Sequence, residues 1–337
     1  MRFLIAGLGS IGRRHLANLL ALGEQDIVLY RSHHSTMRDD RLPGGRSLSE
    51  FPVETDLQAA LKSGVDAVIV SNPTALHLDV AIPAAEAGCH LLIEKPLSHS
   101  FEGVDRLEKM VERSGSRVLA GFQFRFHPGL QQVRRLLDEG AAGRPLSVRA
   151  HWGEYLPGWH TWEDYRQGYS ARQDLGGGVI LTLSHPLDYI RWLLGEVREL
   201  WAFTGEPGDL ELQGVEGLAE IGLRFANEAI GSVHMDYNQR PPAHFLEIVG
   251  SEGMIHWDNA SGEVRYYSCR SDQWQSIPAP QGFERNAMFL AEMRHFIRVA
   301  GGEDEPVCSL SDGRKALQIA LAARESARDG RLVRLES

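Results

Sequence analysis

The first third of the chain alternates short apolar runs with segments in which apolar residues recur at helical spacing. The predicted strands are residues 3–6, 27–30, 67–70, 91–93 and 118–120. The predicted helices are residues 11–22, 56–62, 75–87 and 101–113. Alternation of this kind predicts parallel strands joined by right-handed crossovers, which make a doubly wound sheet.

From about residue 145 the apolar residues fall at every second position, which is typical of strands with one buried face. The predicted strands are residues 147–154, 218–225, 230–237, 245–250, 254–257 and 264–267. Turn-forming residues at 226–228 and 251–253 predict an antiparallel, meander-like sheet. Two helices should follow at 286–299 and 311–328, the second capped by Ser311.

The chain of 337 residues is too long for one ordinary core, so the change of pattern predicts two domains. We expect an α/β fold with a doubly wound parallel sheet in residues 1–122. Residues 123–337 should form an α+β domain with an open, mainly antiparallel sheet.

The amino-acid composition limits the kinds of molecule that the protein can be expected to bind. The hydrophobic share of 43% and charged share of 24% are typical of globular proteins, and no apolar run approaches the roughly 20 residues of a membrane span. The stretch MRFLIAGLG reads as a first strand and not as a signal peptide. A net charge of −10 argues against nucleic-acid and anionic-membrane binding.

The three cysteines, Cys89, Cys269 and Cys308, lie far apart and lack the spacing of zinc ligands. They predict reduced thiols in a cytoplasmic protein. The sequence indicates no metal site.

Three glycines follow the first predicted strand in the stretch GLGSIG. In a dinucleotide-binding loop Gly7 permits the tight turn, Gly9 lets the backbone approach a pyrophosphate, and Gly12 lets helix and strand pack closely. The amides of the helix that begins here would face the phosphates. The sequence therefore predicts a dinucleotide site.

The end of the second predicted strand indicates which dinucleotide binds. NAD sites usually carry an acid there for the ribose 2′-hydroxyl, whereas NADP sites offer an arginine to the 2′-phosphate. This chain has Arg31 and Ser32, and Asp26 lies before the strand. We expect NADP(H) to be preferred over NAD(H), with Arg31 as a solvated loop cation the alternative.

Two further strand ends carry polar residues, in SNPTALH and IEKPLS. After Asn72 and Pro73, Thr74 is expected to cap the next helix, and His77 lies in its first turn as a cofactor contact or as a capping or surface residue. Lys95 stands between a buried run and a proline that ends the strand. Its ammonium is thus expected at a strand exit, where open parallel sheets bind ligands.

These motifs, with GFQFRFHPGL, EGAAGRP and DLGGGVILTLSHPLDY, resemble the glucose-fructose oxidoreductase, inositol dehydrogenase and MocA (Gfo/Idh/MocA) family over nearly the whole chain. The resemblance implies an N-terminal Rossmann domain, a nicotinamide cofactor and an open C-terminal sheet that often mediates oligomers, here a dimer or tetramer. It also implies hydride transfer at a carbinol or carbonyl carbon of a sugar, polyol, sugar acid or nucleotide-sugar.

The resemblance assigns residues as well. Lys95 and His185 match its catalytic positions, with Lys95 hydrogen-bonding the reacting oxygen and the nicotinamide ribose. The matching cofactor positions are Gly7, Gly9, Ser10, Ile11, Gly12, Arg31, Ser32, Asn72, Pro73, His77, Glu94 and Lys95. Many members have an aspartate four residues before the histidine, one helical turn away. Here that residue is Leu181, so either another group orients His185 or its role differs.

His185 precedes the amphipathic segment PLDYIRWLL and is expected near the start of a helix. It could cap that helix. The alternative is catalytic, because a helix N-terminus disfavours the imidazolium and leaves a neutral base to accept the hydroxyl proton.

Residues 154–178 are rich in aromatic and polar side chains and poor in aliphatic ones. Such a segment could stack on a sugar and bind its hydroxyls, or it could be a surface or oligomer-contact loop. Asp188 could instead be a structural hydrogen-bond partner. The candidate substrate residues are Arg125, Trp159, Tyr165, Tyr169, Arg172 and Asp188.

Three functions remain open at this point. The leading one is an NADP(H)-dependent oxidoreductase in which Lys95 polarises the carbinol oxygen and His185 is the general acid or base. A non-catalytic dinucleotide-binding sensor would not need both residues. An enzyme that holds its nucleotide tightly and passes hydride between two sugars would show that nucleotide in its absorption spectrum as purified.

Overall fold

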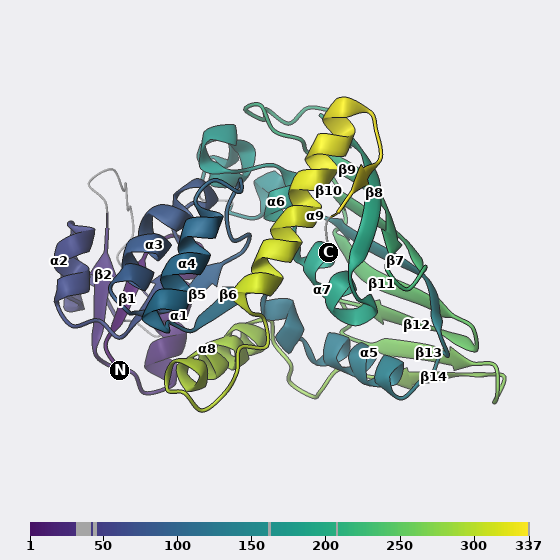
Figure 1. Cartoon of the computed structure of the whole chain (residues 1–337). Coiled ribbons are helices and arrows are strands. Elements are labelled where there is room, and N and C mark those ends of the chain that lie inside the picture. The colour runs from purple at the N-terminus through teal and green to yellow at the C-terminus, as the bar shows by residue number, and fades with distance from the viewer. Residues whose placement is uncertain (32–41, 43–45, 161–162, 207, 336–337) are drawn as a thin grey trace. The chain divides into compact units, whose positions relative to one another are not determined.

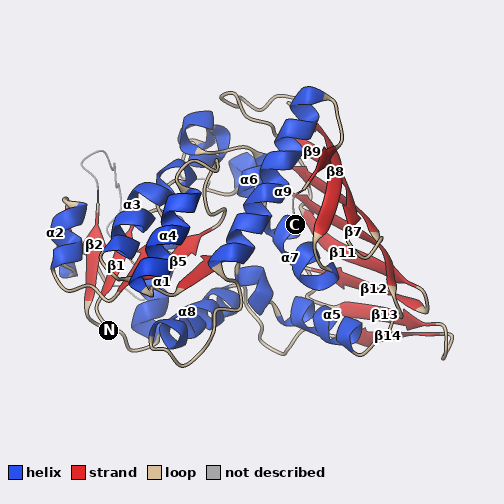
Figure 2. Ribbon diagram, in the orientation of Figure 1, coloured by secondary structure: helices blue, strands red, loops and turns tan. Residues whose placement is uncertain are grey.

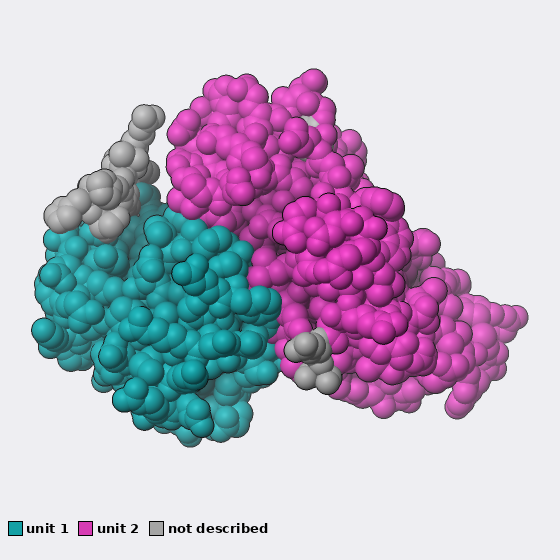
Figure 3. Space-filling view, turned by 45° about the horizontal axis from the view of Figure 1, so that its top comes forward, with its two compact units in different colours: residues 1–123, 285–314 teal, residues 124–284, 315–337 magenta. Residues whose placement is uncertain are grey.

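A computed structural model of the chain describes residues 1–31, 42, 46–160, 163–206 and 208–335. The chain forms two compact units, coloured separately in Figure 3. Unit 1 comprises Met1–Gln123 and Arg285–Arg314, and unit 2 comprises Phe124–Glu284 and Lys315–Ser337. The sequence-based division at 122/123 lies beside the first boundary but does not foresee the return of residues 285–314 to unit 1. Such a return leaves no local mark in a hydrophobic pattern.

Unit 1 is built on six parallel strands in the order β3-β2-β1-β4-β5-β6 (Figure 1). The predicted doubly wound sheet is confirmed, and its order reverses between β1 and β4, where such folds bind ligands. The strands are β1 (Phe3–Ala6), β2 (Ile27–Tyr30), β3 (Val53–Glu54), β4 (Ala67–Val70), β5 (His90–Glu94) and β6 (Val118–Gly121).

Helices cover the sheet of unit 1, whose strands β1, β4 and β6 are buried throughout. The helices are α1 (Ser10–Ala21), α2 (Leu57–Lys62), α3 (His77–Glu86), α4 (Val104–Ser114) and α8 (Asn286–Ala300), with short 3-10 turns η1 (Leu48–Glu50) and η2 (Thr74–Leu76). Helix α8 packs on α1, β5 and β6. The predicted cap at Thr74 is wrong, because Thr74 lies inside the turn η2 and α3 begins only at His77.

Unit 2 contains a nine-stranded sheet in the order β14-β13-β12-β11-β7-β10-β9-β8-β15 (Figure 2). Strand β7 runs parallel to β10 and antiparallel to β11, so it separates two strands that are consecutive in sequence. The simple meander is therefore wrong at this point, although the sheet is mainly antiparallel as predicted. The strands are β7 (Pro145–Gly153), β8 (Val197–Gly205), β9 (Leu218–Phe225), β10 (Ile230–Asp236), β11 (Ala243–Gly250), β12 (Gly253–Asp258), β13 (Val264–Ser268), β14 (Gln273–Ile277) and β15 (Val333–Arg334).

One face of this sheet is covered by helices. Helix α5 (Pro128–Asp138) packs on β12 and β13, α6 (Val179–Thr182) on β9 and β10, and α7 (His185–Leu194) on β7. Alternate residues such as Ala150, Trp152 and Val233 are buried on the helix side. Their neighbours on the strands, including His151 and His234, lie on the opposite face, which we call the open face.

The long helix α9 (Leu310–Asp329) begins with a cap two residues earlier than predicted. The Ser309 hydroxyl accepts a hydrogen bond from the Asp312 amide, and the Asp312 carboxylate accepts one from the Ser309 amide. Ser309 thus caps the helix and Ser311 lies inside it. Within the described ranges, no helix combines the length and apolarity that crossing a membrane requires.

Candidate active site

The glycine loop between β1 and α1 has the geometry of a phosphate cradle. Gly7 has a φ of 100°, and a Cβ there would lie 2.4 Å from the Asn72 nitrogen. A Cβ on Gly12 would lie 1.9 Å from the Gly7 oxygen, whereas one on Gly9 would meet nothing within 4 Å. Gly7 and Gly12 are therefore required by the fold, while Gly9 leaves open space where a pyrophosphate can approach the backbone.

Helix α1 starts directly at this loop. Gly9 is its N-cap, and Ser10 and Ile11 are its first two residues. Amides in the first turn of a helix have no acceptor within the helix, and they lie at the positive end of its dipole. The loop and these amides thus fit a dinucleotide, with Gly9, Ser10 and Ile11 as the residues that would hold the phosphates.

The end of β2 lies beside this loop, because the Gly7 amide is 3.5 Å from the Tyr30 oxygen. Arg31 comes next, and its amide donates to the Glu54 oxygen at the end of β3. Asp26 lies at the other end of β2, as predicted, and its carboxylate is 3.7 Å from Arg2. Ser32 lies outside the described residues. Glu54, an acid beside Tyr30 in the sheet, was missed because β3 has only two residues.

His77 is a buried link between two strand ends. Its Nδ1 lies 3.0 Å from the Pro96 oxygen, and its Nε2 lies 3.0 Å from the Asn72 oxygen. Burial lowers the pKa of His77, with Glu94 and these carbonyls acting against it. The ring is therefore neither a cap nor a surface group, and its contacts are with protein backbone on the predicted cofactor side. It fixes the segment after Lys95 to the end of β4.

Asn72 and Pro73 occupy the end of β4, as predicted. The Asn72 side chain donates through Nδ2 to the Leu76 oxygen at 2.8 Å, and its Oδ1 is buried without a hydrogen-bond partner. Pro73 precedes the η2 turn. The free acceptor on Asn72, next to the backbone that touches Gly7, fits contact with a bound nucleotide.

Glu94 is the last residue of β5, and its side chain is buried. Glu94 Oε1 lies 2.6 Å from His15 Nε2, and Oε2 accepts a hydrogen bond from the Lys95 amide at 3.2 Å. Burial raises the pKa of Glu94, but the hydrogen bond and charge of His15, together with Lys95 and His77, outweigh it and lower that pKa. The sequence expected Glu94 to bind cofactor. Within the protein its carboxylate binds His15 and the Lys95 amide, and Lys95 is half-buried at the strand exit.

A second buried carboxylate lies close to this pair. His15, Glu94 and Glu292 each have a ligand atom within 4.8 Å of the others. Burial and the negative charge of Glu94 raise the pKa of Glu292 well above its usual value. His15 and Glu292 were not foreseen, although each is a polar residue among the apolar positions of its helix, and that signal could have found them.

In unit 2, His185 is the first residue of α7 and is buried, which confirms its expected place at a helix start. Its ring centroid lies 4.9 Å from that of Phe124 and 5.5 Å from that of Trp152, on which it stacks. Leu181 does not lie one turn earlier in the same helix. It is buried in α6, which ends at Thr182. The expectation that residue 181 lies on the same helix as His185, one turn before it, is therefore wrong.

Arg125 and Asp188 bind each other. Arg125 Nη2 lies 2.6 Å from Asp188 Oδ1 and its Nε 3.0 Å from Oδ2, and both side chains are buried. Because a two-point ion pair occupies both partners, the structure favours the alternative of a structural role over direct substrate binding. Asp188 lies on α7 one turn after His185, and Arg125 follows Phe124. The pair thus fixes the helix that carries His185.

Residues 154–160 and 163–178 contain short 3-10 turns that contact one another. The Tyr165 hydroxyl accepts a hydrogen bond from the Glu211 amide, and Arg172 pairs with Asp174 at the surface. Tyr169 is half-buried in the turn that precedes Arg172. Trp159 packs edge-on against Tyr237, and its indole nitrogen is buried without a hydrogen-bond partner. Of these candidates, Trp159 retains a donor that a ligand could use. The turns are η4 (Leu156–Gly158), η5 (Tyr165–Gln167), η6 (Tyr169–Ala171) and η7 (Gln173–Leu175).

The glycine run before α6 is structural. A Cβ on Gly177 would lie 2.2 Å from the Tyr169 oxygen. Gly178 has a φ of 98°, and a Cβ there would lie 2.4 Å from Arg324, which pairs with Glu216. The motif therefore lets the loop pass close to other backbone.

A Rossmann unit with a phosphate cradle, joined to a unit with an open sheet, defines a class of dinucleotide-dependent oxidoreductases. Residues 1–122 match the model of an oxidoreductase family with an NAD-binding Rossmann fold. Residues 130–256 match the C-terminal domain of the GFO/IDH/MocA family. The chain belongs to the GFO/IDH/MocA family.

Two inositol dehydrogenases match this chain over its full length. The chain is 29% identical to a myo-inositol 2-dehydrogenase of Thermotoga maritima, over 100% of this chain and 99% of that protein. It is 25% identical to a scyllo-inositol 2-dehydrogenase (NAD(+)) of Bacillus subtilis, over 100% and 96%. A solved structure of levoglucosan dehydrogenase with NADH and levoglucosan has the same fold, with a TM-score of 0.86, 21% identity and full coverage of both chains.

Proposed function

We propose that the protein transfers a hydride between a nicotinamide cofactor and a carbinol or carbonyl carbon of a sugar, polyol, sugar acid or nucleotide-sugar. The observation that carries the proposal is the glycine loop, where a Cβ on Gly9 would meet open space at the start of α1. Lys95 at the end of β5, on the same edge of the sheet, supports it. The inositol and levoglucosan dehydrogenases among the relatives support the class of substrate.

NADP(H) is the preferred cofactor in this proposal. Arg31 follows β2 beside the glycine loop, while Asp26 lies at the opposite end of that strand. An arginine at this place accommodates a 2′-phosphate, and an acid would repel it. The names of several relatives mention NAD(+) or NADH, so the preference rests on Arg31 alone.

The protein's residues would divide the chemistry as follows. When bound, the nicotinamide accepts the hydride in oxidation and returns it in reduction. The Lys95 ammonium stabilises the negative charge that builds on the substrate oxygen as its proton leaves. His185 accepts that proton in oxidation and returns it in reduction. Glu94 and His77 hold the backbone on either side of Lys95, and Arg125 with Asp188 holds the helix of His185.

In this proposal the aromatic-rich segment 154–178 of unit 2 recognises the substrate. Trp159, with its unpartnered buried indole N–H, is the foremost candidate for a contact with a hydroxyl. Tyr165, Tyr169 and Arg172 would shape the loop around it, since Tyr165 already binds the Glu211 amide and Arg172 binds Asp174.

We also propose a homodimer or homotetramer assembled through the open face of unit 2. That face carries exposed apolar side chains on its strands, among them Trp201, Phe203, Ile230 and Val249. Exposed apolar patches of this kind mark protein interfaces.

The proposal is tested by following NADPH formation and consumption with a panel of inositols, anhydrosugars, sugar acids and nucleotide-sugars. Turnover with at least one member, faster with NADP(H) than with NAD(H), is the expected result. An absorption spectrum of the purified protein shows whether a nucleotide is held tightly throughout. Absence of turnover with every member, with dinucleotide binding retained, would instead favour the sensor.

A further inference from the structure

Four strands of unit 2 place one row of side chains across the open face. His234 of β10 is the register partner of His151 in β7 and of Glu220 in β9. His151 is in turn the partner of Phe245 in β11. The row therefore runs Glu220, His234, His151, Phe245, with each side chain held by its strand.

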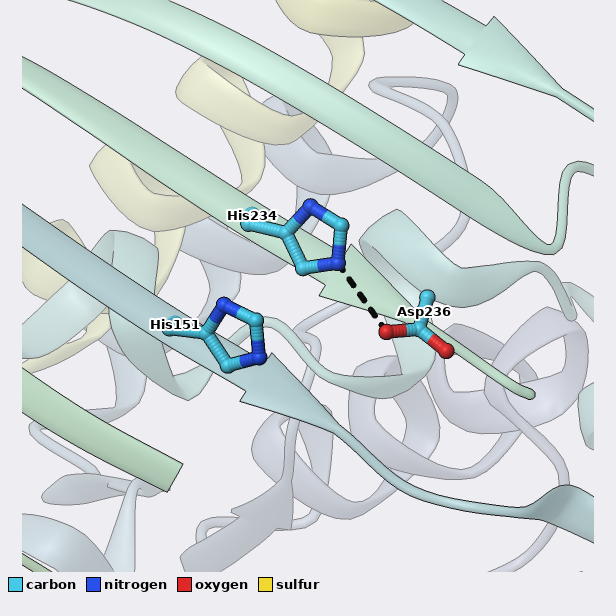
Figure 4. A group of neighbouring side chains, drawn as sticks. All are labelled: His151, His234 and Asp236. Carbon is cyan, nitrogen blue, oxygen red and sulfur yellow. Dashed lines mark hydrogen bonds and ion pairs between the residues drawn. The ribbon is translucent and has the colours of Figure 1, made fainter. Parts of the chain in front are cut away.

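Asp236 completes a cluster with two of these residues, as Figure 4 shows. One ligand atom each from His151, His234 and Asp236 lies within 4.8 Å of the other two. Asp236 Oδ1 accepts hydrogen bonds from the Asn238 and Gln239 amides, both at 2.7 Å. The other carboxylate oxygen, Oδ2, faces His234 Nε2 at 3.0 Å.

The other ring nitrogens and the ring faces also have defined contacts. His234 Nδ1 lies 2.5 Å from Glu220 Oε1. The His151 ring is stacked between His234, at 4.5 Å between centroids, and Phe245, at 4.9 Å. His151 Nε2 lies 2.6 Å from the side-chain oxygen of Gln239.

We propose that His151, His234 and Asp236 form a binding site for a divalent transition-metal ion, with Zn²⁺ the ion that fits best. Two imidazole nitrogens and one carboxylate oxygen are a common zinc donor set. Glu220 receiving the Nδ1 proton of His234 is the carboxylate–histidine–metal arrangement that orients ligand histidines. Gln239 or a water would supply the fourth ligand.

Geometry and charge both allow the ion. Tetrahedral zinc sets its ligand atoms about 3.3 Å apart. The three ligand atoms lie within 4.8 Å of one another, and because the two imidazole rings are stacked, binding requires one ring to turn out of the stack. Glu220 and Asp236 supply two negative charges that match the charge of the ion. The ligands lie on β7 and β10, far apart in sequence, which is why spacing along the chain indicated no metal.

The test uses full-length protein without a histidine tag, stripped with a chelator and titrated with ZnCl₂ by calorimetry. We expect one Zn²⁺ per chain, and we expect Co²⁺ to give the visible absorption of a tetrahedral ion. His151→Ala, His234→Ala and Asp236→Asn should each weaken Zn²⁺ binding by at least about tenfold. Glu220→Gln should weaken it by about tenfold with the stoichiometry unchanged.

A matched control is His256→Ala, which removes another half-exposed histidine on strand β12 of the same sheet. It should bind Zn²⁺ like the wild type. Thermal unfolding checks that each variant is folded. The Co²⁺ spectrum of the wild type tests the site without relying on any variant. Wild-type protein that takes up no stoichiometric Zn²⁺, or ligand variants that bind it unchanged, would overturn the proposal. Neither outcome bears on the oxidoreductase activity.

Discussion

At the scale of single residues, Lys95 is held by buried neighbours on both sides. Glu94 binds its amide and His15, while His77 binds the carbonyl of Pro96. The four-carbon stem of a lysine leaves its ammonium mobile. A rigid backbone is therefore needed before the ammonium can be held in one position. Glu94 and His77 thus help to hold the backbone on either side of Lys95 in place.

Arg31 decides the choice of cofactor in this account. Replacing it with aspartate removes a charge-assisted hydrogen bond to the 2′-phosphate, so Arg31→Asp should weaken NADPH binding by roughly 1.5 to 3 kcal/mol and spare NADH. Nicotinamide fluorescence measures both affinities. Arg113→Asp, at an exposed position of α4, makes the same change of charge and should leave both unchanged. If wild-type protein binds the two cofactors equally, the preference for NADP(H) is wrong.

Glu292 links stability to pH. Its pKa is raised by burial and by Glu94, so the folded protein holds a proton that the unfolded chain releases above about pH 4.3. Stability is therefore lost as the pH rises from that value through the folded pKa. Glu94 has a lowered pKa, and its own contribution is lost only as the pH falls through that lower value.

Glu292→Gln removes this loss because the amide stays neutral. The difference in Tm, variant minus wild type, should be larger at pH 8 than at pH 5. The control Glu112→Gln changes an exposed residue of α4 and should show a constant difference. A difference for Glu292→Gln that is the same at both pH values would mean that Glu292 titrates like an exposed acid.

His185 is expected to be the base of the oxidation. His185→Asn should abolish the acidic limb of the pH profile of kcat/KM and lower the rate by about two orders of magnitude or more. Leu181→Asp is unsuitable as a companion, since Leu181 is fully buried and a carboxylate there would be desolvated. His256→Asn, on β12, is the control. An unchanged limb in His185→Asn would assign the proton to another group, with Lys95 the next candidate.

At the scale of elements, the sequence predicts buried strands best. Strands β1, β2 and β4 begin and end as predicted because each is an unbroken apolar run. Strand β8 was missed because Trp201 and Phe203 are apolar and exposed, which hides the alternation. Strand β14 was missed because nearly all its residues are exposed. The insertion of β7 between β10 and β11 depends on tertiary pairing, which no local pattern records.

The glycine loop gives a prediction at this scale, since Gly7 and Gly9 have different tasks. Gly7→Ala should destabilise the fold by more than about 1 kcal/mol, because it combines a positive φ with a 2.4 Å contact. Gly9→Ala should keep the wild-type Tm and weaken NADPH binding by about tenfold or more, because its Cβ enters the space for the pyrophosphate. Unfolding and fluorescence titrations of both variants measure this. Equal effects of both substitutions on Tm would contradict the assignment.

At the scale of the whole molecule, the two units differ in how far their sites could be predicted. The cofactor side of unit 1 follows from motifs at strand ends, which the fold gathers at one edge of the sheet. The substrate side of unit 2 does not. Arg125 and Asp188 bind each other, Tyr165 binds the Glu211 amide and Arg172 binds Asp174. The partner of a side chain depends on the tertiary structure. Residue type alone therefore cannot distinguish a residue that contacts a ligand from one with a structural role.

Lys95→Ala tests the central claim most directly, through turnover with an active substrate and NADPH titration of the same preparation. Loss of a transition-state electrostatic contact of roughly 3 to 4 kcal/mol should lower kcat by two or more orders of magnitude, with the fold and at least weak cofactor binding retained. Lys109→Ala, at an exposed position of α4, should turn over like the wild type. Turnover of Lys95→Ala near the wild-type rate would show that Lys95 is only a cation at a strand end and would contradict the account.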